Sequence, residues 1–357
     1  MRYRGCTQSV SHATATYAIA TRLHTYCRYG GGNVGTNGGV NNDTIAQMAI
    51  LKAIGGNAFR VNLYPTSYVK GLPSGKANWS HPLPETLDAV LSASLEAGLD
   101  SPYLILEYYA TMIDTLGLGD YSQFRTIGKA FASYAGPGGT WARAHNASAS
   151  FGIRHYTWAN EPDGTDFDKG GKLGPEPYRM ALQGLSDGVK SVDSSLLVLG
   201  GGLKTPNMGG GGSLRGIGAS LQPLWANGSL DAIDLHTYNG PKYAPLNKTY
   251  GWSANQDFEA VVSYNGVNRT AGASPLQFIA TELNYKSEVT GEDVATRGLF
   301  TCLVDNAGVI APPRVSGAPA GLGVPTTAVI FPWNLFHTPG SDSNYGMAYS
   351  LSPYKPT

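Results

Sequence analysis

The sequence predicts an α/β fold, a single (β/α)8 TIM barrel with long βα loops that spans residues 1–357. Short apolar runs alternate with segments of helical periodicity, which is typical of repeated βα units and a parallel sheet. Chemically versatile side chains follow the carboxyl ends of several of these runs. An open doubly wound sheet would show a similar alternation, but only a barrel brings all strand ends to one mouth. The position of the polar residues therefore favours the barrel.

Seven apolar runs are predicted strands. In chain order they are Ala58–Leu63, Tyr103–Tyr108, Ile153–Trp158, Leu196–Leu199, Ala232–His236, Leu276–Ala280 and Ala328–Phe331. They read as continuous apolar runs, as expected for parallel strands covered on both faces. The eighth strand is expected near the N-terminus, at Tyr3–Thr7 or at Leu23–Arg28, and the pattern does not choose between them.

Apolar stripes at helical spacing separate several of these strands. They comprise Ile45, Met48, Leu51 and Ile54; then Phe124, Ile127, Phe131 and Tyr134; then Tyr178, Ala181, Leu182, Leu185, Val189 and Val192; and a helix across Val294 to Val304. Trp79, Trp225 and Trp252 are expected in loops, either as stacking platforms for sugar rings or as buried loop anchors.

Composition limits the partners that the protein is expected to bind. Only 14% of residues are charged and the formal net charge is +0, so nothing indicates nucleic acid or an anionic membrane surface. No apolar run reaches the ~20 residues that cross a bilayer. No His, Cys and Asp residues have metal-ligand spacing, so no metal and no cofactor is expected. We expect a monomer that acts on neutral oligo- or polysaccharides.

The low charge and high Tyr and Gly content suit a secreted, extracellular protein, although lineage bias in composition would look the same. Such a location requires a leader segment that this sequence does not show. Three cysteines are too few for a disulfide framework. Cys6 and Cys27 form one bridge in an oxidising compartment, or all three thiols pack as small hydrophobic groups.

Two glutamates carry the functional prediction. Glu161 and Glu282 lie far apart in sequence, yet each follows an apolar strand. On a barrel, the fourth and seventh strands face each other across the mouth. Hydrolysis of a glycoside needs two carboxyl groups that flank one bond, and one must stay protonated while the other stays ionised. A separation of about 5–5.5 Å between the two carboxyl groups would allow a covalent intermediate, and so a retaining glycosidase with Glu161 as acid/base and Glu282 as nucleophile.

Neighbouring residues supply the remaining parts of the predicted site. Arg60, on the second strand, is placed to hold Glu282 ionised, and Tyr238 to donate a hydrogen bond to the same carboxylate. Other candidates at strand ends are His236, Trp333 and Glu107, the last either lining a subsite or forming a structural salt bridge. Two alternatives stay open: a non-catalytic glycan-binding barrel, and an inverting hydrolase with carboxyls about 6.5–9.5 Å apart.

These motifs resemble those of clan A glycoside hydrolases. The segment Trp158-Ala159-Asn160-Glu161-Pro162 resembles the acid/base motif of the clan, and Thr281-Glu282-Leu283-Asn284 is similar to its nucleophile motif. The pair His236-Thr237-Tyr238 and the segment Phe331-Pro332-Trp333-Asn334 resemble its sixth- and eighth-strand segments, and Arg60 resembles its second-strand arginine.

The order and spacing of the motifs look most like family 39, with families 5 and 30 possible. The resemblance implies a (β/α)8 barrel and retaining cleavage of β-linked glycans. It also implies that Asn160 contacts the sugar 2-hydroxyl and that Trp333 forms the floor of the subsite where the reacting sugar binds. It does not settle the sugar, the linkage, or endo against exo cleavage.

Overall fold

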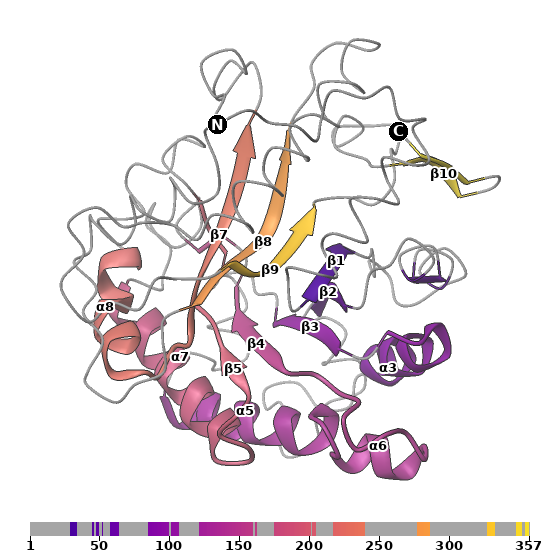
Figure 1. The fold of residues 1–357 in the computed structure, drawn as a ribbon. Helices are drawn as coiled ribbons and strands as arrows, with labels where there is room; N and C mark the ends of the chain where they lie inside the picture. Colours follow the sequence, from indigo (N-terminus) through magenta and orange to yellow (C-terminus); the bar gives the residue numbers. More distant parts are fainter. Residues whose placement is uncertain are drawn as a thin grey trace, which may run out of the picture.

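The computed structural model describes residues 29–33, 45, 48–49, 52, 58–63, 85–99, 101–106, 121–159, 161–162, 175–200, 202–204, 217–239, 277–285, 327–332, 348–351 and 354–356. Its helices are α3 (Glu85–Ala97), α5 (Tyr121–Ala135), α6 (Thr140–Ala144), α7 (Pro175–Lys190) and α8 (Ile217–Asn227). Its strands are β1 (Tyr29–Asn33), β2 (Ala58–Leu63), β3 (Ser101–Leu106), β4 (His155–Trp158), β5 (Leu197–Val198), β6 (Leu203–Lys204), β7 (Ala232–Asn239), β8 (Gln277–Tyr285), β9 (Thr327–Pro332), β10 (Ala348–Leu351) and β11 (Tyr354–Pro356). Figure 1 shows the helices outside the strands.

Nine of these strands form one parallel sheet in the order β5-β4-β3-β2-β1-β9-β8-β7-β6. The two ends of this order lie next to each other. Leu199, directly after β5, forms an isolated parallel bridge with Ala232 of β7, and β6 pairs with the same strand. Parallel strands interspersed with helices confirm the predicted α/β class. The strands β10 and β11 form a separate antiparallel pair.

The prediction for the first strand was wrong. β1 covers Tyr29–Asn33 and pairs with both β2 and β9, which is the position that the first strand was expected to hold. Both predicted segments, residues 3–7 and 23–28, lie outside the described residues. The strand was missed because its sequence, Tyr-Gly-Gly-Gly-Asn, is mostly glycine and contains no continuous apolar run.

The helices α5 and α7 pack with their backbones close together. A Cβ atom added to Gly188 would lie 2.1 Å from the carbonyl oxygen of Arg125, and one added to Gly128 would lie 2.4 Å from that of Leu185. Only glycine permits this approach, since interiors pack without space for an additional carbon atom. Figure 1 shows the two helices side by side below β4 and β5.

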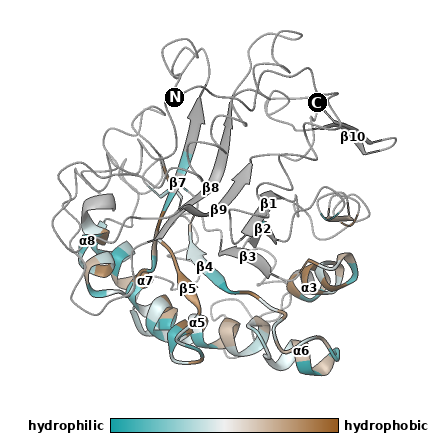
Figure 2. Cartoon of the chain, viewed as in Figure 1, coloured by the Kyte–Doolittle hydropathy of each residue, from teal (hydrophilic) through white to brown (hydrophobic). Residues whose placement is uncertain are grey.

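The predicted stripes of these two helices are confirmed in most positions. Figure 2 shows hydrophilic and hydrophobic residues mixed along both helices, as expected for amphipathic helices that cover a sheet. Phe124, Ile127 and Phe131 of α5 are buried, and so are Tyr178, Ala181, Leu182, Leu185 and Val189 of α7. The stripe of α7 was extended too far, because the helix ends at Lys190 and Val192 is 40% exposed.

Three of the described helices, α3, α6 and α8, were not predicted. α3 buries Leu87, Val90 and Leu91, and α8 contains Pro223 in its interior. Trp225 lies in α8, not in a loop, and is fully buried, so it is not a sugar platform. Its ring nitrogen donates a hydrogen bond to the carbonyl oxygen of Ala232, which attaches α8 to the start of β7. None of the described helices is long and apolar enough to span a membrane.

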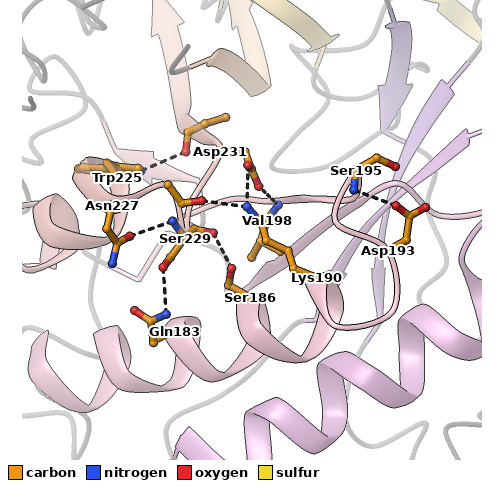
Figure 3. A network of polar contacts seen from close by, with 12 residues as sticks. Gln183, Ser186, Lys190, Asp193, Ser195, Val198, Trp225, Asn227, Ser229 and Asp231 are labelled. Atoms are coloured by element: carbon orange, nitrogen blue, oxygen red, sulfur yellow. Dashed lines mark hydrogen bonds and ion pairs between the residues drawn. The ribbon is translucent and has the colours of Figure 1, made fainter. Parts of the chain in front are cut away.

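A hydrogen-bond network joins α7 to the segments that enter β5 and β7 (Figure 3). The Lys190 ammonium lies 2.8 Å from an Asp231 carboxylate oxygen, and the other oxygen accepts a hydrogen bond from the backbone N–H of Val198. The Ser186 hydroxyl donates to the carbonyl oxygen of Ser229 at 2.5 Å. The network therefore fixes the amino-terminal ends of two neighbouring strands against one helix.

Candidate active site

Glu161 follows β4 in a strained stretch of backbone. Three described non-glycine residues have positive φ, and two of them are Ala159 (63°) and Glu161 (48°), on either side of Asn160. A left-handed conformation is sterically costly for a residue with a Cβ atom, on the order of 1–3 kcal/mol each. Strain of this kind persists only where the surroundings hold it, and it is concentrated at functional sites.

Aromatic packing holds the end of β4 in place. Trp158 is 1% exposed and lies against Phe124 of α5 and Tyr178 of α7, with ring centroids 4.3 and 5.2 Å away. The Tyr178 hydroxyl also donates a 2.9 Å hydrogen bond to the Trp158 carbonyl oxygen. The same two helices that pack through glycines thus anchor the residue from which the strained turn begins.

The carboxyl group of Glu161 pairs with the imidazole of His236. The Nδ1 atom of His236 lies 2.9 Å from Oε1 of Glu161, and the two residues are 75 positions apart in sequence. The His236 side chain is fully buried, whereas that of Glu161 is 21% exposed. A neutral imidazole nitrogen accepts or donates a hydrogen bond, depending on its tautomer. With its hydrogen on Nδ1, His236 donates to Oε1 both when Glu161 is ionised and when it is protonated on its other oxygen.

His236 reaches this position beside a glycine on the neighbouring strand. Gly202 immediately precedes β6, and a Cβ atom added there would lie 2.0 Å from Nε2 of His236. The backbone of β6 runs in register with that of β7, with Lys204 opposite His236. The imidazole therefore lies between the strand backbone at Gly202 and the carboxyl group of Glu161.

Glu282 lies in β8 with its backbone in register with that of His236. Neighbouring strands are about 4.8 Å apart, so the two backbone positions are direct neighbours. The β7–β8 pairing shifts register between Leu235 and His236, and irregularities of this kind are frequent next to active sites. Tyr238 pairs with Asn284 two residues further along the same strands.

Arg60 is fully buried in β2, where its backbone is in register with Tyr103 of β3 and Asn33 of β1. A fully buried guanidinium indicates that its charge is compensated by polar or charged groups inside the protein, unlike the charge of a surface arginine. The structure thus places Arg60 on the predicted second strand. Asn160, Glu107 and Trp333 lie outside the described residues, so their predicted roles stay predictions.

Two residues at this site were not predicted. Gly202 belongs to a run of three glycines that follows the predicted strand Leu196–Leu199. The feature that could have pointed to it is this run of residues without side chains at a strand end. Asp234 is fully buried on β7, two residues before His236, and its signal was an acidic residue inside an apolar run. Among the described residues, no group of three or more His, Cys, Asp or Glu side chains is arranged to hold a metal ion.

The fold is similar to that of several glycoside hydrolases of known structure. A family 39 glycoside hydrolase from Bacteroides cellulosilyticus WH2 has a TM-score of 0.59 and 15% identity, over 93% of this chain and 61% of that one. The bacterial orthologue of human α-L-iduronidase has a TM-score of 0.59 and 16% identity, over 90% of this chain and 51% of that one. An endo-1,4-β-mannanase from Rhizomucor miehei has a TM-score of 0.53 and 15% identity, over 89% of each chain.

The chain thus spans 61% and 51% of the length of the first two proteins. Neither a protein-family model nor a curated protein matches the sequence. At 15–16% identity, the three structural similarities concern the fold and not the substrate. The resemblance to family 39 that the motifs predicted is confirmed at this level: the chain shares its fold with family 39 glycoside hydrolases.

Proposed function

We propose that this protein is a retaining glycoside hydrolase of β-linked oligo- or polysaccharides, with Glu161 as acid/base and Glu282 as nucleophile. One observation carries the proposal. The Glu161 carboxyl group, at the end of β4, is paired with the buried His236, and Glu282 occupies the backbone position next to His236 on the neighbouring strand. Two glutamates from distant parts of the sequence are thus both neighbours of His236, Glu161 through its carboxyl group and Glu282 through its backbone position.

We further propose that the sheet closes as the predicted (β/α)8 barrel. Residues 197–204 pair with β4 on one side and with β7 on the other. Counted as one position, this segment reduces the nine parallel strands to the eight of a barrel. Active sites of such barrels lie at the carboxyl ends of the strands, and Glu161 follows the carboxyl end of β4.

In the first step of the proposed reaction, the Glu282 carboxylate attacks the anomeric carbon and the glycosidic C–O bond breaks. The proton of Glu161 is transferred to the departing oxygen, so the leaving group departs as a neutral alcohol. In the second step, ionised Glu161 removes a proton from water. The water oxygen attacks the same carbon, the ester bond to Glu282 breaks, and the sugar leaves with its original configuration.

His236 supports Glu161 in both steps. With its proton on Nδ1, the imidazole donates a hydrogen bond to Oε1 in both steps, so the proton that Glu161 transfers is carried on its other oxygen, Oε2. We also propose that Arg60 and Tyr238 keep Glu282 ionised, that Asn160 and Trp333 position the reacting sugar, and that Glu107 lines a subsite. No step requires a cofactor. A single catalytic domain over residues 1–357, a monomeric state and an extracellular location complete the proposal.

The test is a screen of the wild type on β-glucans, xylans, mannans and galactans, with NMR identification of the first anomer released. We expect one of these glycans to be cut with retention, and Glu282→Ala and Glu161→Ala to abolish cleavage. Glu176→Gln is the matched control, because it removes an exposed carboxylate of α7 whose partner is Arg179. An inverted product would remove the nucleophile role from Glu282. Binding without cleavage of any glycan would favour the non-catalytic alternative.

A further inference from the structure

We propose that Gly202 is a positioning residue for the acid/base: the absence of a side chain at this residue sets the place of the His236 imidazole and, through it, of the Glu161 carboxyl group. This inference rests on the proposed function. Gly202 does not contact Glu161 or the reacting sugar in this proposal. It acts only through the ring that it faces.

The contact between Gly202 and His236 leaves no space for a Cβ atom. A Cβ at residue 202 would lie 2.0 Å from Nε2, 2.4 Å from Cδ2 and 2.7 Å from Cε1 of His236. Ordinary van der Waals contact begins at 3.4 Å, so the ring would have to move by about 1.4 Å. Gly202 itself is not in the left-handed region, and an alanine there would be excluded by the imidazole and not by its own backbone.

The ring has little freedom to move away. His236 is fully buried, and its backbone is paired with β6 on one side and with β8 on the other. The two ring nitrogens point in widely different directions, so a shift away from Gly202 moves Nδ1 toward Glu161. That nitrogen is already 2.9 Å from Oε1, which is the normal length of a hydrogen bond.

Glu161 would then have to give way. Its backbone is fixed in a positive-φ conformation between Ala159, which is also strained, and Pro162, which has a fixed φ of its own. The displaced part is therefore the carboxyl group, the group that transfers the proton. A displacement of about 1 Å is enough to lower the rate of a positioned catalytic group strongly.

The consequence for catalysis is selective. Protonation of the leaving oxygen by Glu161 matters most for poor leaving groups, because good ones depart without it. Gly202→Ala should therefore lower kcat/KM for a phenyl β-glycoside by about 10²-fold, within the range that general acid catalysis contributes. Because kcat/KM reports the first step, in which a good leaving group needs no proton, kcat/KM for the 2,4-dinitrophenyl β-glycoside of the same sugar should fall by less than about threefold. A general loss of folded structure would lower both rates equally.

The matched control is Gly200→Ala. This glycine lies two residues earlier and is also buried, but a Cβ there would meet the side chains of Leu221 at 3.0 Å and Trp225 at 3.4 Å. It does not face the imidazole, so neither kcat/KM for the two aryl glycosides nor the ratio of these two values should change. The sugar used for both probes is the one that the wild type cleaves in the glycan screen.

A double-mutant cycle tests the contact without relying on activity. If the imidazole causes the conflict, Gly202→Ala should lower the Tm by roughly 2–6 °C in the wild-type background and by less than about 1 °C in the His236→Ala background. In addition, 15N NMR should show shifted imidazole resonances of His236 in Gly202→Ala and unshifted ones in Gly200→Ala. If the wild type cleaves no glycan, the proposed function fails, while the cycle and the NMR spectra still decide the Gly202–His236 contact.

Three results would overturn the proposal. One is an equal loss of kcat/KM on both aryl glycosides in Gly202→Ala. Another is an equal Tm penalty in the presence and absence of the imidazole. The third is an unchanged His236 resonance in a folded Gly202→Ala protein.

Discussion

The two ends of the parallel strands differ in how their polar groups are used. At the amino-terminal ends of β5 and β7, Asp231 pairs with Lys190 and accepts a hydrogen bond from the backbone of Val198, and the Ser186 hydroxyl donates to the Ser229 carbonyl oxygen. At the carboxyl end of β4, the backbone is strained at Ala159 and Glu161, and a carboxyl group faces a buried imidazole. Polar groups at the amino-terminal ends stabilise the fold, whereas those at the carboxyl end of β4 are positioned for the proposed proton transfer.

This contrast has a physical basis. A loop that only connects elements is most stable when each donor meets an acceptor and each residue adopts a favoured conformation. A site that transfers protons needs groups whose protonation changes, and holding such groups in place costs stability. We therefore expect substitutions at the carboxyl end to affect activity, and those at the amino-terminal end and in its supporting helices to affect stability.

The largest expected effect comes from His236. His236→Ala should lower kcat on a phenyl β-glycoside by about 10²–10³-fold, because Glu161 loses the partner that supports both of its protonation states. His236→Asn should recover part of this loss, since its amide nitrogen lies near the position of Nδ1. The measurement is kcat and KM for each variant, with the Tm recorded alongside. A loss that Asn does not reduce would indicate that the imidazole only fills space.

The next effect is structural and leaves the chemistry intact. Gly188→Ala introduces a Cβ atom 2.1 Å from the Arg125 carbonyl oxygen, so α5 and α7 must separate. We expect the free energy of unfolding to fall by about 1–3 kcal/mol or more, as in other overpacked interiors. Urea unfolding measures it, with Met180→Ala on the exposed side of α7 as control. Unchanged stability would contradict the close contact of the two backbones.

A smaller effect is expected from the network itself. Asp231→Ala removes the acceptor of the buried Val198 N–H and the partner of Lys190. A buried N–H group without an acceptor lowers the free energy of unfolding by about 1–3 kcal/mol, and loss of the partly exposed ion pair with Lys190 lowers it little further. The kcat of the folded fraction should not change. The comparison between the two ends would lose its basis if this variant lost activity without losing stability.

The smallest expected effect concerns the backbone strain at Ala159, after the carboxyl end of β4. Ala159→Gly removes the steric strain of a positive φ of 63°, which stabilises the folded protein, but it also raises the conformational entropy of the unfolded chain. The two effects should nearly cancel, so the free energy of unfolding should change by no more than about 0.5 kcal/mol. The same exchange at Ala181, in the middle of α7, should cost about 1 kcal/mol because nothing is relieved there. Equal losses at both positions in urea unfolding would argue against strain at Ala159.

The sequence by itself determined the periodic part of this protein. β2, β4, β7, β8 and β9 lie where apolar runs predicted them, because burial of a strand on both faces requires continuous apolar residues. Glu161 and Glu282 were predicted as site residues from their positions after apolar runs, and Arg60 from its place on the second strand. Glu161 does follow β4, whereas Glu282 lies inside β8, which continues to Tyr285. The glycine-rich β1 and the helices α3, α6 and α8 were missed. β1 has no continuous apolar run and α6 is only five residues long, whereas α3 does carry Leu87, Val90 and Leu91 at helical spacing, and the prediction overlooked it.

Only the tertiary structure decided which of these residues meet. His236 was predicted as a site residue at a strand end without an assigned partner, and the fold pairs it with Glu161, 75 residues away. Gly202 has no side chain to signal a role, and its importance appears only as the space that it leaves for an imidazole from another strand. A sequence pattern indicates which residues are buried. Contacts between strands depend on register and on backbone separation, and these are set by the packing of the whole sheet.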